Sequence, residues 1–246
     1  VIGHRNGAIA MRGLTIARKE FDDALRSRML WGIVVIIAAM TSLSAGLSLL
    51  IPEMDANAEV AIGGASQFAG LLVPIMALIA AYLAIAGERE SGSLKVLLGL
   101  PPSRGEVVGG KFVGRSGVVA LGITLGFVVS GIVTMALYSD FPVAAFAGTT
   151  VLTVLLGISF VGIAIGISAV TTSRARAMTL AITTYLGLTL LWDLVPLGIH
   201  LAVTGEMPGT VVPAWYLLAE GLSPTGAYNV LVHSLLLGTQ LTTEAR

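Results

Sequence analysis

The chain has 246 residues, of which 55% are hydrophobic and only 11% are charged, and its mean hydropathy is +0.91. Soluble domains carry about 25% charged residues, so this composition excludes an ordinary water-soluble protein. The 14 basic and 14 acidic side chains balance, so the net charge indicates no partner, and we expect no nucleic-acid partner. The absence of cysteine excludes disulfides, thiolate metal sites and cysteine nucleophiles.

The start of the chain precedes the first long apolar run. Residues 1–10 show no helical pattern and are expected to be an unstructured lead, whereas residues 11–246 are expected to form a single transmembrane domain. From Met11 to Arg28 apolar residues recur at helical spacing, with oppositely charged pairs on the other face. This pattern favours an amphipathic helix at the membrane interface, and an ordinary solvated helix is the alternative. We expect no cleavable signal peptide, because the first long apolar run begins near residue 29 and has spanning length.

Long apolar runs with short polar breaks dominate the rest of the chain. A membrane helix needs roughly 20 apolar residues, and five runs reach that length. The sequence therefore predicts an all-α, polytopic membrane helix bundle with five clear spans. They cover about residues 29–51, 64–86, 112–137, 144–170 and 177–203, the last interrupted by Asp193.

After residue 203 the pattern is interrupted by glycine, proline, glutamate and histidine. For residues 211–238 we expect short re-entrant or interfacial helices on the outer face, which requires that protein or water covers their backbone. A sixth span that returns to the cytoplasm would then be missing.

The distribution of lysine and arginine predicts the orientation. Six lie in the N-terminal segment, five between residues 87 and 115, and two at Arg174 and Arg176, so 13 of the 14 fall on one side of the predicted membrane. Because basic loops stay in the cytoplasm, we expect the N-terminus and these loops there, in a multi-pass protein of the cell membrane.

A charged, turn-rich insert, Gly87–Lys111, separates the second and third apolar runs. Ser91 or Ser93 can cap a short helix over residues 94–98, which Gly99 and the following two prolines would end. Ser103 and Glu106 form a capping-box pattern, which predicts a second helix that continues through Lys111 into the third span. The insert would thus be a cytoplasmic coupling helix joined to two spans by stiff corners. Alternatively, it is a loop that only sets the topology.

The run GERESGSLKVLLGLPPSRGEVVGGKFVGR in this insert resembles the first cytoplasmic loop of permease subunits of type-2 ABC transporters, in particular the NosY-like branch. The opening RGLTIARKEFDDALRSRMLW resembles the N-terminal helix and first span of that family, and LSPTGAY at 222–228 resembles its outer segment. The resemblance implies a six-span permease that forms a homodimer or heterodimer and binds a separate ABC ATPase subunit through this loop. The sequence departs from the family by showing no clear sixth span.

Carried over by position, the resemblance implies three groups of residues. The ATPase contact would comprise Glu88, Arg89, Glu90, Gly92 and Ser93, to which we add Lys95; the corner would comprise Pro101 and Arg104; and Gly110 and Lys111 would mark the return to the membrane. For Lys111 and Arg115, contact with solvent or lipid headgroups is an equal alternative. Apart from the resemblance, Arg174 and Arg176 are expected to form a second, smaller cytoplasmic contact.

Other motifs give little sign of chemistry. Residues 105–111, GEVVGGK, match most of a P-loop, but Phe112 stands where that loop needs Ser or Thr to hold magnesium. We therefore expect no ATPase site and no cofactor in this chain, with ATP and Mg on the partner. The three histidines lack ligand spacing, so no metal site is expected.

Two features inside the spans have alternative interpretations. Gly122-x-x-x-Gly126 favours close helix packing within one subunit, and a dimer interface is the alternative. Asp193 is the single acid inside a span. Intramembrane carboxylates are often functional, so substrate or proton movement is one hypothesis, although Trp192 and Pro196 indicate the outer interface.

Together these observations favour the permease subunit of an ATP-driven transporter, most simply an exporter in the lipid bilayer. An ion-gradient-driven secondary transporter or channel is an alternative, as is a non-transporting membrane anchor of an assembly system.

Overall fold

The computed structural model describes residues 28–50, 57–91, 103–209 and 212–244. The expected unstructured lead, nearly all of the expected N-terminal amphipathic helix and the expected short helix at 94–98 lie outside the described residues.

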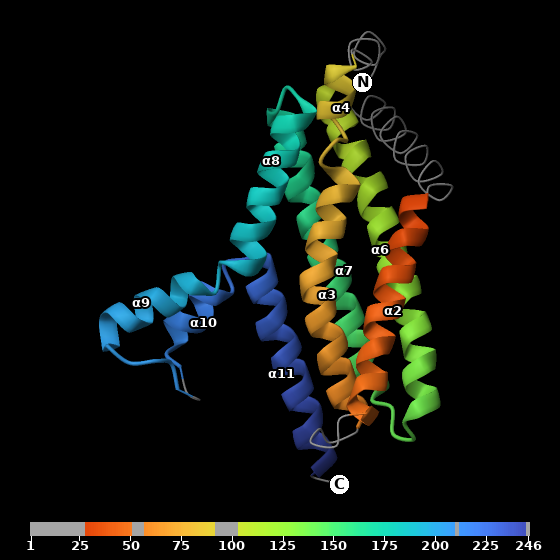
Figure 1. The fold of residues 1–246 in the computed structure, drawn as a ribbon, viewed down its shortest axis with the longest axis vertical. Coiled ribbons are helices and arrows are strands. Elements are labelled where there is room, and N and C mark those ends of the chain that lie inside the picture. The colour runs from red at the N-terminus through yellow and green to blue at the C-terminus, as the bar shows by residue number, and fades with distance from the viewer. Residues whose placement is uncertain (1–27, 51–56, 92–102, 210–211, 245–246) are drawn as a thin grey trace, which may run out of the picture.

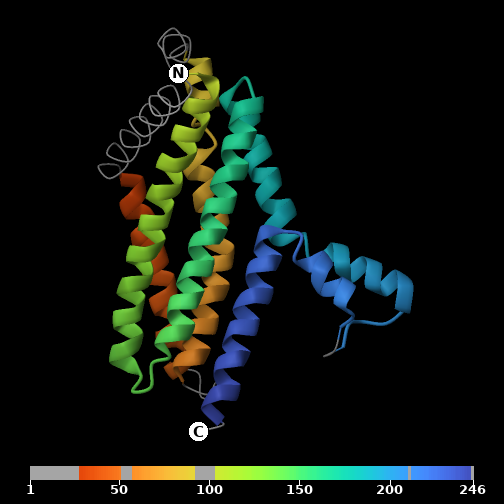
Figure 2. The same ribbon diagram turned by 180° about the vertical axis from the view of Figure 1, so that it is seen from behind.

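Long helices lie side by side and form the body of the molecule (Figures 1 and 2). Within the described residues, four helices are long and apolar enough to cross a membrane, or five if one bent pair counts as a single span. The structure therefore confirms an all-α, polytopic membrane bundle. The four helices are α2 (Arg28–Leu50), α3 (Ala58–Ala81), α6 (Arg104–Leu137) and α7 (Val143–Val170).

The limits of two spans differ from the prediction because capping residues determine them. α3 begins six residues before the predicted run, where the Asn57 side chain accepts a hydrogen bond from the Val60 N–H. α6 begins at Arg104, directly after Ser103, as the capping-box pattern predicted. An N-terminal cap supplies partners for amide groups that have none within the helix.

Small residues allow the helices to approach closely. A Cβ atom on Gly122 would lie 2.8 Å from Ile33 Cγ2 of α2, and one on Gly126 would lie 2.7 Å from Ile37 Cγ2. The Gly122-x-x-x-Gly126 motif therefore packs α6 against α2 within one subunit. Phe127 and Phe160 fill the core, and both are fully buried.

The predicted span 177–203 is not one straight helix. α8 (Arg174–Tyr185) passes into a π-helical turn, η1 (Leu186–Leu190), and α9 (Leu194–Thr204) then departs at 47°. Pro196 favours the break, because proline has no N–H for a hydrogen bond to the preceding turn and therefore fits the first turn of a new helix. α9 ends at Gly205, whose φ of 73° is the left-handed conformation that favours glycine.

The region expected to hold only short interfacial helices contains a long one. α10 (Ala214–Glu220) is short, but α11 (Pro224–Glu244) has 21 residues and packs against α3 and α7 (Figure 2). Pro224 starts this helix instead of breaking it, since the Ser223 hydroxyl accepts the Gly226 N–H at 2.8 Å. Gly226 leaves no room for a Cβ atom against the Glu220 carbonyl.

The two ends of the bundle differ. One end, here called the α4 end, carries the short helix α4 (Ala86–Glu90) together with the start of α6 and of α8 (Figure 1). The opposite end carries the turn between α6 and α7 and the end of α11. α9 and α10 extend sideways from the bundle, between the two ends.

Candidate functional site

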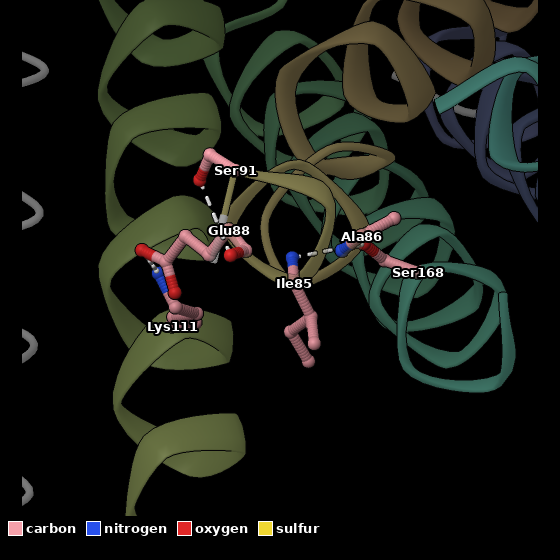
Figure 3. A network of polar contacts seen from close by, with 6 residues as sticks. All are labelled: Ile85, Ala86, Glu88, Ser91, Lys111 and Ser168. Carbon is pink, nitrogen blue, oxygen red and sulfur yellow. Dashed lines mark hydrogen bonds and ion pairs between the residues drawn. The ribbon is translucent and has the colours of Figure 1, made fainter. Parts of the chain in front are cut away.

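The short helix α4 follows α3 after a turn at residues 82–85, and its beginning is fixed by a residue from α7. The Ser168 hydroxyl is fully buried and accepts hydrogen bonds from the Ile85 and Ala86 N–H groups, both at 2.9 Å (Figure 3). A single hydroxyl of α7 therefore satisfies two backbone donors at the start of α4 and joins the two helices.

Glu88 links α4 to α6. Its carboxylate lies 2.7 Å from the Lys111 ammonium, and Lys111 is only 2% exposed (Figure 3). A buried ammonium is unfavourable without an anionic partner. Lys111 is thus an internal residue, and its burial contradicts the alternative of a solvent or headgroup contact at this position. The neighbouring Gly110 is buried too, whereas Arg115 is half-buried.

Arg89 links α4 to the end of α7. Its guanidinium donates to the Thr171 carbonyl at 2.7 Å and to the Ala169 carbonyl at 3.0 Å. The last carbonyls of a helix have no partner within the helix, and they carry partial negative charge. The cation therefore binds where two such acceptors converge.

Glu90 links α4 to α8. Its carboxylate accepts a hydrogen bond from the Arg174 N–H at 2.6 Å, at the first residue of α8. The Ser173 hydroxyl accepts from the Arg176 N–H at 3.4 Å in the same turn. A carboxylate is favourable at this position because the start of a helix carries partial positive charge.

The three consecutive charged residues of α4 thus bond to three different helices. We call Glu88, Arg89 and Glu90, with their partners Lys111, Thr171 and Arg174, the α4 junction. This arrangement resists displacement of α4 relative to α6, α7 or α8, because each movement breaks at least one charge-assisted hydrogen bond.

The start of α6 completes the site. The Ser103 hydroxyl accepts the Glu106 N–H at 3.3 Å, and the Glu106 carboxylate accepts the Ser103 N–H. Arg104 is exposed in the first turn. Residues 105–111 are helical throughout and do not form a phosphate-binding loop.

The other predicted contact residues are placed only in part. Gly92, Ser93, Lys95 and Pro101 lie outside the described residues. Arg174 and Arg176 are exposed in the first turn of α8. Arg176 lines an open hollow of about 530 Å³ beside the end of α7, together with Thr172 and Thr179.

Sequence reasoning missed Ser168 and Thr171. Ser168 lies within an apolar run, so no local signal indicated that it holds α4. Thr171 begins the TTSR stretch before α8, where the helix-start pattern was visible at Ser173 but the acceptor role of the Thr171 carbonyl was not.

Asp193 lies far from the α4 junction, between η1 and α9, and it is exposed. The adjacent Trp192 donates its indole N–H to the Ala219 carbonyl at 3.0 Å, which brings α10 close. Partial burial raises the pKa of the Glu220 carboxyl, and the negative charge of Asp193 raises it further. Burial raises the pKa of the Tyr216 phenol, and the negative charges of Glu220 and Asp193 raise it further.

Comparison with known proteins identifies the family of the chain. Residues 14–244 match the family described as ABC-2 family transporter protein. The chain is 31% identical over 223 residues to the probable ABC transporter permease protein NosY of Pseudomonas aeruginosa, which covers 88% of this chain and 80% of that protein. It is also 31% identical over 225 residues to the protein of the same description in Stutzerimonas stutzeri, covering 88% and 79%. The chain therefore belongs to the ABC-2 family, whose members are membrane permease subunits of ABC transporters.

Proposed function

We propose that this permease subunit serves an ATP-driven exporter and that a separate ATPase drives it through the segment from Glu88 to Lys111. This proposal rests on the α4 junction. A force on α4 is shared at once by α6, α7 and α8, because one charged side chain of α4 bonds to each of them. The relatives are described as permease proteins of ABC transporters, and such transporters are driven by an ATPase subunit.

The charges support an orientation with the α4 end in the cytoplasm of the cell membrane. Arg89, Arg104, Arg174 and Arg176 are exposed at this end. Glu59 and Asp140 lie at the starts of α3 and α7, toward the opposite end. Basic residues next to spans favour the cytoplasmic side, which is also the side where ATP is available.

Nucleotide and magnesium belong to the partner in this proposal. The GEVVGGK segment is helical, and its lysine is bound to Glu88, so these residues do not cradle a phosphate. A complete transporter would contain two permease subunits, identical or related, and the ATPase would bind at the α4 end of each.

Cross-linking from single cysteines tests this arrangement, because the natural sequence has no cysteine. Arg104→Cys places a thiol at the exposed start of α6, and Asp140→Cys places a matched exposed thiol at the opposite end. With a short bifunctional maleimide and the ABC ATPase that co-purifies with the chain, we expect Arg104→Cys to cross-link to the ATPase and Asp140→Cys not to do so. Cross-linking from Asp140→Cys instead would overturn both the orientation and the coupling site.

A further inference from the structure

A half-open hollow of about 440 Å³ lies among α2, α3 and α11, away from the α4 junction. Ligand pockets commonly have volumes of about 300–1,000 Å³, so its size suits a small molecule. Its deepest polar neighbours are already paired: the Ser66 hydroxyl donates to the Gly63 carbonyl, and the Ser44 hydroxyl donates to the Ala61 carbonyl.

Three polar side chains converge on this hollow from two helices. Gln67 belongs to α3, whereas Asn229 and His233 are four residues apart on α11 and therefore share a face. Gln67 and Asn229 are two of the five side-chain amides in the whole sequence, so their meeting at one site is unusual for this chain. Within the described residues, none of these three side chains has a hydrogen-bond partner.

The arrangement behind the hollow fixes Asn229 in place. The preceding residue, Tyr228, is buried, and its hydroxyl lies 3.1 Å from the Thr153 hydroxyl and donates to the Ser66 carbonyl at 3.2 Å. Asn229 Oδ1 would lie only 3.5 Å from a Cβ atom on Gly70, so its amide lies against α3. The packing of α11 against α3 therefore fixes the position of the Asn229 amide.

Lipid is a poor occupant for such a surface. An amide or imidazole that faces hydrocarbon without a hydrogen bond costs on the order of 1–3 kcal/mol. The remaining lining is apolar and includes Leu47, Val60, Phe68 and Leu236, and none of the described residues that line the hollow is Asp, Glu, Lys or Arg. The lining therefore suits a ligand that has hydrogen-bonding groups and an apolar part but no charge.

We propose that this hollow binds a small, uncharged amphipathic molecule through Gln67, Asn229 and His233. The inference rests on the proposed transport function, for which it names the class of substrate. Gly63 supports the proposal. A Cβ atom at this position would meet only Leu236 Cδ1, at 3.7 Å, so close helix packing does not require a glycine here. Its small size instead leaves the hollow open.

Thiol accessibility in proteoliposomes tests the proposal without requiring ATP turnover. Phe68→Cys places a thiol in the hollow and keeps Gln67, Asn229 and His233, and Val151→Cys places one on the exposed apolar face of α7 at a similar distance from the helix start. We expect a charged, membrane-impermeant methanethiosulfonate to label Phe68→Cys about tenfold faster, because charged reagents enter hydrocarbon poorly. Hexyl glucoside, an uncharged amphipathic probe, should slow that labelling, and Gly63→Leu should abolish the protection by filling the hollow.

Three outcomes would overturn the proposal. Labelling no faster than at Val151→Cys would mean that the hollow is covered, and a disulfide between two Phe68→Cys chains would mean that a second copy covers it. Fast labelling without protection by hexyl glucoside would exclude the stated ligand class. If Phe68→Cys elutes as an aggregate in gel filtration, Leu47→Cys serves in its place. Failure of the Arg104→Cys cross-link would remove the coupling proposal and leave this result unaffected.

Discussion

The Glu88 carboxylate and the Lys111 ammonium lie 2.7 Å apart, although 23 residues separate them in the sequence, and Lys111 is buried. This ion pair connects the short helix after the second span to the first turns of the third. It gives the charged insert a structural role in addition to any contact with a partner.

The ion pair predicts that loss of Glu88 alone destabilises the protein more than loss of both charges. Glu88→Ala removes the carboxylate that lies 2.7 Å from a buried ammonium and should lower the free energy of unfolding by about 2–3 kcal/mol. The double variant Glu88→Ala/Lys111→Met should recover much of that loss, since no buried charge remains. Thermal unfolding in detergent measures both. Equal destabilisation of the single and double variants would contradict the prediction.

A conservative substitution of Arg89 should separate binding of the ATPase from the coupling of its turnover to the permease. Arg89→Lys retains the charge but cannot donate to two carbonyls from one planar group, so the hold on the end of α7 should weaken. We expect the ATPase to co-purify as with the natural chain. ATP turnover by the complex should fall about three- to tenfold, which corresponds to the loss of roughly one such hydrogen bond. Glu206→Gln, an exposed change outside the junction, is the control. Unchanged turnover in Arg89→Lys would argue against transmission through this contact.

The glycines of α6 and α7 predict opposite effects of the same substitution. Gly126→Ala would place a Cβ atom 2.7 Å from Ile37 Cγ2 and should cost about 1–3 kcal/mol through overpacking. Gly166→Ala meets nothing within 4 Å and should be neutral or stabilise by about 0.5–1 kcal/mol, because alanine loses less backbone entropy than glycine. Unfolding in detergent compares the two. Adding Ile37→Val to Gly126→Ala should restore part of the loss.

Glu220 predicts a pH effect on the α9–α10 region. Because burial and then the charge of Asp193 raise the pKa of the Glu220 carboxyl, the folded state favours its protonated form. Its contribution to stability is therefore complete below the ordinary carboxyl pKa and is lost as pH rises through the raised value. Glu220→Gln should flatten the dependence of the melting temperature on pH in the range above the ordinary carboxyl pKa. Asp193→Asn should reduce it, and an unchanged profile in both variants would refute the assignment.

Local patterns in the sequence were enough for much of the fold. The apolar runs at 29–51 and 144–170 agree closely with α2 and α7, because spanning length and hydropathy are properties of contiguous residues. The start of α6 was predictable for the same reason, since Ser103 and Glu106 cap the helix within one turn. In contrast, α11 was missed because Pro224 and His233 were interpreted as interruptions, although Pro224 occupies the first position of the helix.

The sequence alone thus determined that the chain is a helical membrane protein and where its charged insert lies. Only the tertiary structure decided what the charges of that insert do. The partners of Arg89 and Glu90 lie more than 80 residues further along the chain, at Thr171 and Arg174. The bend after η1 and the meeting of Gln67 with Asn229 depend in the same way on how distant helices pack. Such contacts arise from helix packing in three dimensions, and no local spacing of residue types specifies them.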